Sequence, residues 1–338
     1  MDPVAALRRI AYLLEAEGAG TYKVRAFRHA ATTLSGETPA RIEELSRSGR
    51  LTSLPGIGDS TAAVVAEALA GGDPAYLTDL LQRADPPLTG PAAALRTSLR
   101  GDCHSHSDWS DGGSPIAEMA DAARALGHEY WALTDHSPRL TVAHGLNPER
   151  LRQQLDIVAE LNEELAPFRI LTGIEVDILE DGTLDQDQSL LAELDVVVAS
   201  VHSKLSMDAA PMTRRMVRAI ESPHTDILGH CTGRKLVGKG RPESRFDADL
   251  VFAACARTGT AVEINSRPER RDPPEPLLRQ ALALGCLVSI DTDAHAPGQL
   301  EWLGNGCRQA VEADTPADRV VNAWPLARFL HWTAGHAA

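Results

Sequence analysis

The sequence predicts an α/β protein in which a small all-helical part precedes a β/α barrel. Residues 1–84 carry apolar residues at helical spacing and show no strand pattern. From residue 99 onward, short apolar runs rich in β-branched residues recur every ~30 residues, the length of one β/α unit. Because most of these runs end in His, Asp or Glu, the pattern also predicts a site at the carboxyl rim of the barrel.

The helical part contains amphipathic segments and one conspicuous turn. Apolar residues recur at helical spacing in residues 4–14 and again in 24–34. The turn LPGIG at residues 54–58 precedes a third helical run, which begins at Ser60 and stops at two glycines. We expect residues 1–84 to form a domain of their own.

Residues 85–98 are interpreted as a linker, because their first half is rich in proline and glycine. Residues 99–338 then form the predicted barrel. Its expected strands are seven apolar runs, at residues 99–104, 130–135, 170–175, 196–202, 226–230, 261–265 and 287–293. The segments between them include helical patterns at 116–126, 148–165 and 248–257.

The composition excludes several classes of protein. The chain has 338 residues, of which 43% are hydrophobic, enough for a packed core. No apolar run reaches the ~18 residues of a membrane span. Arg8 and Glu15 interrupt the first apolar segment, so it is not a signal peptide. Five cysteines without a CxxC pair argue against a disulfide framework. We therefore expect a cytoplasmic protein.

The charge is concentrated in the barrel part. The formal net charge is −14, and residues 1–84 contribute only −1, from nine Lys/Arg against ten Asp/Glu. An acidic body of this kind repels polyanions at long range and is typical of a chain that keeps carboxylates for metal ions. No basic stripe exists, so we expect any contact with nucleic acid at local basic spots.

Histidines and acids at the ends of the expected strands predict a metal centre. His104 and His106 stand two residues apart, so on a strand both imidazoles point to one face. Asp293 and His295 repeat this spacing at the last strand. Further candidates at or just beyond strand ends are Asp111, His136, Glu175, His202 and His230. Nine such side chains at one rim would repel and desolvate one another unless cations were bound. An isolated histidine such as His128 is interpreted as a core residue.

Several motifs together resemble the polymerase and histidinol phosphatase (PHP) superfamily over roughly residues 99–338. They are GDCHSHSDWSDG, ALTDHS, GIEVDI, ASVHS, ILGHCTGR, VEINSRP and DTDAHAPG. The nearest likeness is to the C-terminal PHP domain of bacterial family X DNA polymerases. This resemblance implies a distorted seven-stranded β/α barrel with three divalent metal ions, for which Zn, Mn and Fe all suit His, Asp and Glu ligands.

Carried over position by position, the resemblance implies three sets of ligands. The first set is His104, His106, Glu175 and Asp293. The second is Glu175, His202 and His230, with Glu175 bridging, and the third is Asp111, His136 and His295. We assign catalysis to the first set.

The N-terminal part resembles the small DNA-binding domain of family X polymerases. The resemblance lies in KVRAFRHAA and GRLTSLPGIGDSTAAVVAEALAGG, and PGIG belongs to helix-hairpin-helix elements. We expect Gly56 and Gly58 to let backbone N–H groups approach a DNA phosphate, although a module that binds another partner is the alternative.

Two departures limit the expected activities. Ser60 and Val64 stand where relatives with deoxyribose-phosphate lyase activity carry lysines, so no Schiff base can form. Only residues 85–98 separate the two parts, which leaves no room for polymerase palm and fingers. We expect neither lyase nor polymerase activity.

The predicted function is a metal-dependent phosphoesterase, because clustered ions lower the pKa of a bridging water to about 7 and supply hydroxide. The relatives imply a substrate among nucleic-acid ends or nucleotides, with a 3′–5′ exonuclease or 3′-phosphatase role. We expect Arg234 and Arg267 to bind the substrate phosphate, with Lys204 and Arg270 as weaker candidates. The alternatives are a small-molecule phosphatase of the histidinol-phosphate type and a non-catalytic DNA-repair adaptor with structural metals.

Overall fold

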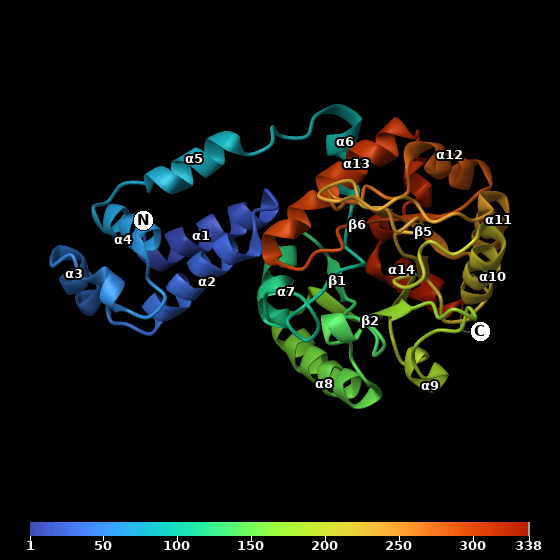
Figure 1. Cartoon of the computed structure of the whole chain (residues 1–338), viewed down its shortest axis with the longest axis horizontal. Coiled ribbons are helices and arrows are strands. Elements are labelled where there is room, and N and C mark those ends of the chain that lie inside the picture. Colours follow the sequence, from blue (N-terminus) through green and yellow to red (C-terminus); the bar gives the residue numbers. More distant parts are fainter. Residues whose placement is uncertain (337–338) are drawn as a thin grey trace. The chain divides into compact units, whose positions relative to one another are not determined.

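The computed structural model describes residues 1–336 and divides into two compact units (Figure 1). The first, here called the helical unit, comprises residues 1–87 together with 297–299. The second, here called the sheet unit, comprises the rest of the described chain. The order of a helical part followed by an α/β part is the one that the sequence predicts.

The helical unit is built from five α-helices and one 3-10 turn. They are α1 (Pro3–Ala16), α2 (Thr21–Ser35), α3 (Pro39–Arg47), the turn η1 (Leu51–Ser53), α4 (Asp59–Leu69) and α5 (Ala75–Arg83). The side chain of Asp2 caps α1, and that of Thr38 caps α3. Leu7 of α1 and Phe27 of α2 lie in one hydrophobic core, so the apolar spacing of 4–14 and 24–34 does mark buried helix faces.

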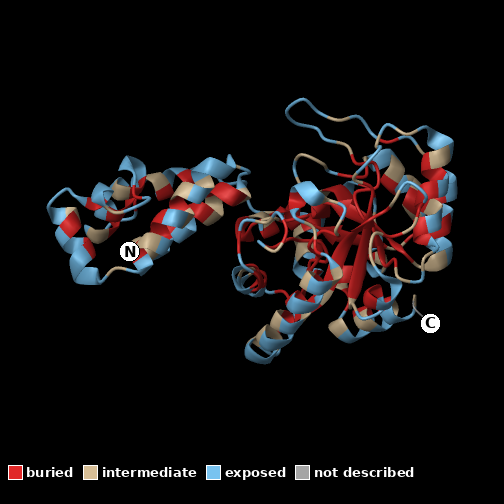
Figure 2. Ribbon diagram, turned by 60° about the horizontal axis from the view of Figure 1, so that its bottom comes forward, coloured by how far each residue is buried: buried red, intermediate tan, exposed pale blue. Residues whose placement is uncertain are grey.

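The sheet unit contains six parallel strands that are neighbours in chain order. They are β1 (Tyr130–Leu133), β2 (Arg169–Asp177), β3 (Val196–Ser200), β4 (Ile227–Leu228), β5 (Ala261–Asn265) and β6 (Val288–Asp291). Figure 2 shows these strands buried behind helices whose outer faces are exposed. Burial on both faces explains why the strands read as continuous apolar runs rather than alternating ones.

Helices precede β1, connect successive strands and follow β6. They are α6 (Gly90–Ser98), α7 (Ile116–Ala125), α8 (Pro148–Leu165), α9 (Gln188–Leu191), α10 (Ala209–Ile220), α11 (Ala248–Thr258), α12 (Glu275–Ala283), α13 (Leu303–Glu312) and α14 (Leu326–Ala334). Shorter 3-10 turns are η2 (Thr141–Ala143), η3 (Pro297–Trp302), η4 (Ala317–Arg319) and η5 (Val321–Ala323). Among residues 1–336, no helix combines the length and apolar character needed to cross a membrane.

The sequence predicts seven strands, and the described part of the chain shows six. The run at residues 99–104 is the one without a strand assignment. It does lie beside β1, because the Ala132 N–H donates to the Asp102 carbonyl at 2.9 Å. Toward β6, however, the Cys103 N–H donates at 2.8 Å to the side chain of Asp291 instead of a backbone carbonyl. Backbone bonds follow just beyond, where the Asp293 N–H donates to the His104 carbonyl at 2.9 Å and Ser105 forms an isolated parallel bridge with Ala294. The segment thus lies between β6 and β1 without forming a regular strand, and the sheet has six strands.

The stretch interpreted as a linker, residues 85–98, contains the helix α6. Leu95 of α6 and the following Leu99 share a hydrophobic core with Leu303 and Cys307 of α13. The proline-rich half, before residue 90, carries no helix. Residues 88–98 accordingly group with the sheet unit.

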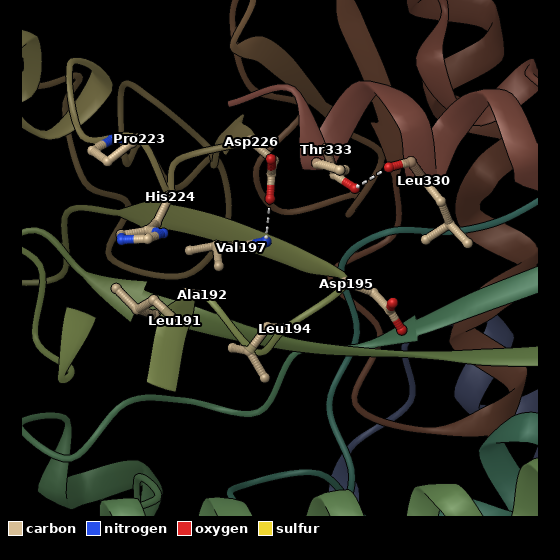
Figure 3. Close-up of a pocket in the computed structure, with 11 residues that line it drawn as sticks. Leu191, Ala192, Leu194, Asp195, Val197, Pro223, His224, Asp226, Leu330 and Thr333 are labelled. Atoms are coloured by element: carbon tan, nitrogen blue, oxygen red, sulfur yellow. Dashed lines mark hydrogen bonds between the residues drawn. The ribbon is translucent and has the colours of Figure 1, made fainter. Parts of the chain in front are cut away.

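A pocket lies at the amino ends of β3 and β4 (Figure 3). Its carboxylate Asp226 accepts a hydrogen bond from the Val197 N–H at 2.8 Å and contacts His336 Nδ1 at 2.7 Å. The candidate metal-binding groups found among residues 1–336 all lie at the opposite, carboxyl end of the strands.

The buried His128 makes the stability of the sheet unit sensitive to acid. It is 5% exposed, and neither ring nitrogen has a hydrogen-bond partner. Burial, together with the charge of Arg96, lowers the pKa of His128 to about 3. The unfolded chain has a histidine pKa of about 6.5, so it binds the proton first, and stability is lost as pH falls from about 6.5 toward 3.

We expect His128→Leu to remove this part of the pH dependence. At about pH 5 the histidine is protonated in the unfolded chain but not in the folded one. This difference lowers the free energy of unfolding of the wild type by roughly 2 kcal/mol relative to neutral pH. Urea unfolding of both proteins at neutral pH and at about pH 5 measures the difference. His331→Leu, at an exposed position of α14, is the control and should keep the wild-type pH slope. An unchanged slope in His128→Leu would contradict the prediction.

Candidate metal centre

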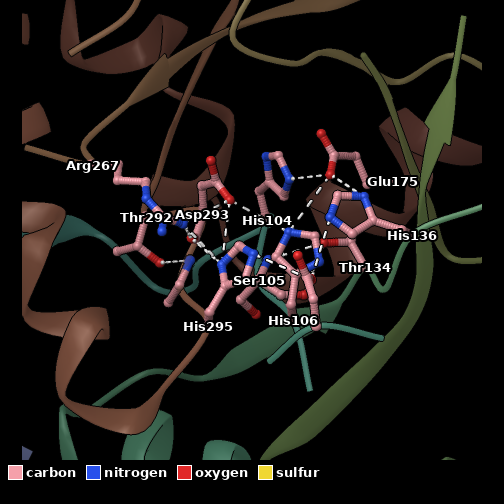
Figure 4. A network of polar contacts seen from close by, with 12 residues as sticks. His104, Ser105, His106, Thr134, His136, Glu175, Arg267, Thr292, Asp293 and His295 are labelled. Atoms are coloured by element: carbon pink, nitrogen blue, oxygen red, sulfur yellow. Dashed lines mark hydrogen bonds and ion pairs between the residues drawn. The ribbon is translucent and has the colours of Figure 1, made fainter. Parts of the chain in front are cut away.

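The residues predicted as metal ligands come together at the carboxyl ends of the strands. Figure 4 shows six of them, which are His104, His106, His136, Glu175, Asp293 and His295. Glu175 belongs to β2, and His136, His202 and His230 follow β1, β3 and β4 respectively. Asp293 and His295 follow β6, and Asp111 lies in the loop before α7. His104 and His106 precede α7 in the sequence, in the segment that lies beside β1. Parallel strands place their ends at one rim, which is why residues far apart in sequence meet here.

Glu175 lies at the middle of this group and is 1% exposed. Its carboxylate oxygens approach five imidazoles: His104 Nε2 at 3.3 Å, His106 Nε2 at 3.6 Å, His136 Nδ1 at 2.9 Å, His202 Nε2 at 3.2 Å and His230 Nε2 at 2.9 Å. His104, His106 and His136 face one oxygen, whereas His202 and His230 face the other. The two oxygens of Glu175 thus face two separate groups of imidazoles.

Asp111 organises the outer edge of the group. Its Oδ1 lies 3.4 Å from His136 Nε2 and 3.3 Å from His295 Nε2. The ring of His106 lies between these two imidazoles, with ring centroids 4.4 Å from His136 and 4.3 Å from His295. Three sets of ligand atoms fall within 4.8 Å of one another: His106, Asp111, His136 and His295; His104, His106 and Glu175; and His136, Glu175 and His202.

Unsatisfied polar atoms in this group fit bound cations. Both carboxylate oxygens of Glu175, both ring nitrogens of His106 and of His230, and His104 Nε2 are buried without a hydrogen-bond partner. Buried polar atoms are normally paired, and each unpaired one costs about 1–3 kcal/mol. Imidazole nitrogens and carboxylate oxygens in such numbers are ligands that Zn, Mn and Fe accept. The clusters are therefore suited to metal binding.

The electrostatics of the cluster act in opposite directions on its members. Burial opposes a charge on His104 and His202, but Glu175 raises the pKa of His202 to about 9 and that of His104 well above the ordinary value, so cations bound here would displace these protons. Burial opposes a charge on Glu175, but the positive charges of His202 and His104 lower its pKa well below the ordinary value. Burial together with the neighbouring charge of His295 lowers the pKa of His106 to about 3. At neutral pH the carboxylate is thus ionised and His106 is neutral, as metal coordination requires.

Two further carboxylates hold the imidazoles from behind. Glu263 Oε1 lies 2.6 Å from His104 Nδ1, and its other oxygen accepts the backbone N–H of His230. Asp177 Oδ1 contacts His202 Nδ1. Such partners fix the tautomer and the ring orientation of a metal-binding histidine. Sequence patterns did not lead us to these roles, although Asp177 follows Glu175 by two residues on one strand and therefore shares its face.

The predicted phosphate-binding arginines lie in different surroundings. Arg267 Nη1 is 2.8 Å from the carbonyl oxygen of Asp293 and 2.9 Å from His295 Nδ1, so it borders the metal centre. Arg234 instead donates to the carbonyls of Arg270, at 2.9 Å, and Arg271, and so it braces a loop.

Arg270, which the sequence made only a weaker candidate, lies directly against the acid cluster. Its Nε is 2.9 Å from Asp293 Oδ2, and its buried Nη1 has no hydrogen-bond partner. Burial opposes the charge on Asp293, but Arg267 and Arg270 lower its pKa well below the ordinary value. Arg267 and Arg270 are therefore the two cations at the edge of this centre.

The predicted DNA-binding glycines lie in the turn before α4. Gly56 has φ +75°, and a Cβ there would lie 1.9 Å from His29 Nδ1, so no larger residue fits without a shift of that ring. The Gly58 N–H donates to Thr61 Oγ1 at 3.0 Å and is already partnered. A hollow of about 380 Å³ beside both glycines is also lined by Lys23. DNA binding through this turn stays a prediction.

Comparison with known proteins identifies both parts of the chain. Residues 1–74 match the helix-hairpin-helix domain family, and residues 102–267 match the PHP domain family. The DNA polymerase/3'-5' exonuclease PolX of Bacillus subtilis is 42% identical over 228 residues, which cover 68% of this chain. That match spans 40% of the length of the Bacillus protein. A probable phosphatase of Thermoanaerobacter sp. is 28% identical over 232 residues, covering 65% of this chain and 89% of that protein.

Among solved structures, a histidinol phosphate phosphatase from Lactococcus lactis, complexed with zinc, L-histidinol and phosphate, matches 65% of this chain and 94% of its own. The sequence identity is 19% and the TM-score is 0.45. The domain matches confirm the predicted family and the predicted enzyme class, a phosphoesterase hydrolase. The chain thus begins with a helix-hairpin-helix domain and belongs, through residues 102–267, to the PHP domain family.

Proposed function

We propose that this phosphoesterase is metal-dependent and hydrolyses phosphate esters at nucleic-acid ends or in nucleotides. The observation that supports the proposal is the buried Glu175 among five imidazoles, with Arg267 and Arg270 at the edge of the same cluster. Cations beside a metal-binding cluster suit a phosphoryl group, whose oxygens gain negative charge in the transition state.

Three divalent ions would be held by three sets of side chains. These are His104, His106, Glu175 and Asp293; Glu175, His202 and His230; and Asp111, His136 and His295. When bound, ions of this kind polarise the phosphoryl oxygens and activate water for attack at neutral pH. Zn, Mn and Fe all suit these ligands.

The side chains of the protein orient the substrate and the ligands. Arg267 and Arg270 hold the phosphoryl oxygens by charge-assisted hydrogen bonds. Glu263 keeps His104 in the tautomer that leaves Nε2 free to bind a metal, and Asp177 does the same for His202. The burial of Glu175 excludes bulk water from the bridging position.

A nucleic-acid substrate is favoured by the relatives and by the helix-hairpin-helix domain. The Bacillus relative is named for 3'-5' exonuclease activity, and we propose the same activity, or a 3′-phosphatase, for this chain. DNA would be the partner of the helical unit through Gly56 and Gly58.

A test with end-labelled oligonucleotides checks this function. Substrates with a 3′-hydroxyl or a 3′-phosphate are incubated with the Mn- or Zn-loaded full chain. We expect release of mononucleotides or of phosphate, and we expect His104→Ala to release neither. Absence of both products with the wild type would contradict the proposal.

A small-molecule phosphatase is the second candidate. The Thermoanaerobacter relative, a probable phosphatase, matches over 89% of its own length, so a protein little longer than the matched region carries that name. Comparing kcat/KM for histidinol phosphate, a nucleoside 3′,5′-bisphosphate and an oligonucleotide separates the two candidates. A metal-loaded protein that binds DNA but turns over none of these substrates would instead favour a DNA-repair adaptor.

A further inference from the structure

The loop between β4 and α11 is basic in an otherwise acidic chain. Residues 229–247 carry five Lys/Arg against one Glu and one Asp, a formal charge of +3, whereas the whole chain carries −14. The five cations are Arg234, Lys235, Lys239, Arg241 and Arg245. Positive charges this close together repel one another, so the fold is more stable when a negatively charged group lies near them.

Residues 235–241 of this loop form a short hairpin, here called the basic hairpin. The Lys235 N–H donates to the Arg241 carbonyl at 3.0 Å, and the Arg241 N–H donates back at 2.9 Å. At its tip, Leu236 is 52% exposed and Val237 is 55% exposed. The tip therefore presents apolar and cationic side chains together.

The basic hairpin is fixed beside the metal centre. The Leu236 N–H donates at 2.7 Å to the carbonyl of Glu269, which stands between Arg267 and Arg270 in sequence. Arg234, just before the hairpin, donates to the carbonyl of Arg270 at 2.9 Å. The loop that carries the two arginines of the metal centre thus also anchors the hairpin.

A hollow of about 530 Å³ adjoins the basic hairpin on the side of the loop after β3. Lys204, Arg241 and Arg245 line it, and Lys204 follows the metal-ligand candidate His202 by two residues. The one carboxylate in the lining, Glu243, lies 3.3 Å from Arg234. Arg245 also lies 3.5 Å from the exposed Asp208. The three cations of the hollow thus have two carboxylates near them, one of which, Glu243, also pairs with Arg234.

These cations are close enough to affect one another. Partial burial, followed by the charge of Arg270 and then that of Arg241, lowers the pKa of Lys235. Partial burial and the charge of Arg270 also lower the pKa of Arg241. Crowding of this kind weakens when an anion lies between the cations, as in a site built for phosphates.

We propose that the basic hairpin and the adjoining hollow bind the backbone phosphates of a nucleic-acid strand whose terminal ester lies at the metal centre. This inference rests on the proposed function and extends it to one substrate class, the oligonucleotide. A lone phosphomonoester needs no cations beyond Arg267 and Arg270. Additional phosphates explain the cations at Lys204, Lys239 and Arg245, and the exposed Leu236 and Val237 offer apolar contact for sugars or bases.

The test compares two double variants with equal change of charge. Lys239→Glu/Arg245→Glu reverses two exposed cations of the proposed surface. Arg124→Glu/Arg257→Glu reverses two exposed cations in the last turns of α7 and α11 and is the control. Both variants are made in the full, Mn-loaded chain, and thermal unfolding checks that each is folded.

Two readouts separate the hairpin from the metal centre. The first is the Kd of a fluorescent hexanucleotide with phosphorothioate linkages, measured by anisotropy at several salt concentrations. We expect the hairpin variant to raise this Kd at least about tenfold over the control and to flatten its salt dependence. The second is hydrolysis of bis(p-nitrophenyl) phosphate, which we expect to be equal in both variants.

The outcomes decide the two proposals separately. Equal hexanucleotide affinity in the hairpin and control variants would overturn the strand-binding role. Loss of bis(p-nitrophenyl) phosphate hydrolysis in the hairpin variant alone would overturn it too, because the surface would then serve the metal centre itself. If the wild type hydrolyses no phosphate ester, the proposed function fails, while the two Kd values still decide whether the hairpin binds a strand.

Discussion

Replacing Glu175 by glutamine is expected to abolish hydrolysis and to reduce the bound metal. Glutamine keeps the shape of the side chain but removes the negative charge and replaces one ligand oxygen with an NH₂ group, which cannot bind a cation. Because both oxygens of Glu175 face imidazoles of the proposed ligand sets, the change affects two ion positions at once. We expect kcat to fall at least about 10³-fold, which corresponds to roughly 4 kcal/mol of transition-state stabilisation.

Elemental analysis and steady-state kinetics of Glu175→Gln measure this effect. The matched control is Glu164→Gln, which makes the same chemical change at an exposed position near the end of α8. The control should keep the wild-type metal content and kcat. A Glu175→Gln protein with full metal content and more than about a tenth of the wild-type kcat would contradict a bridging role for this residue.

Removal of the divalent ions by a chelator is expected to abolish activity and to lower the thermal stability. The buried nitrogens and oxygens of the cluster lose their only partners when the ions leave, and each unpaired atom costs about 1–3 kcal/mol. Ions that bind only the folded chain stabilise it by about 4 kcal/mol when present at 1,000 times their Kd. The melting temperature should therefore fall on chelation and rise again on reconstitution.

Reconstitution of the chelated protein also measures how many ions each chain binds. Titration of the chelated protein with Mn or Zn, followed by elemental analysis, should reach three ions per chain at the point where activity is restored. Full activity at a single ion per chain would contradict the proposed use of all three ligand sets. A melting temperature that does not respond to the chelator would contradict the view that the ions satisfy the buried atoms.

The sequence predicted the candidate metal ligands because their positions follow from a repeating pattern. Strand-end residues such as Glu175, His202 and His230 recur at the interval of a β/α unit, and parallel strands bring them to one rim. The pair His104 and His106 was predictable from the two-residue period of extended chain. These inferences need only secondary structure and topology.

Contacts that depend on loop conformation were not predictable in the same way. Arg234 and Arg270 both follow strand ends, and nothing in the sequence shows that Arg234 turns to backbone carbonyls while Arg270 turns to Asp293. Glu263 of β5 contacts His104 Nδ1 and accepts the His230 N–H just after β4, and these contacts depend on how the chain segments pack against β5. The segment expected as a strand at residues 99–104 lies beside β1 but pairs irregularly toward β6, where the Asp291 side chain accepts the Cys103 N–H and only an isolated bridge, Ser105 to Ala294, follows.

The bond from the Cys103 N–H to the Asp291 carboxylate has a consequence for how this centre can change over evolution or by engineering. The segment that carries His104 and His106 is held toward β6 by this side chain and, just beyond β6, by two backbone bonds. The Asp293 N–H donates to the His104 carbonyl at 2.9 Å, and the His106 N–H donates to the Ala294 carbonyl at 2.7 Å. Substitution at position 291 thus removes one side-chain support of this segment, while the two backbone bonds beside the imidazoles are left in place. The side chain at position 291 is therefore a place where the support of both histidines can vary without loss of the backbone register that holds them.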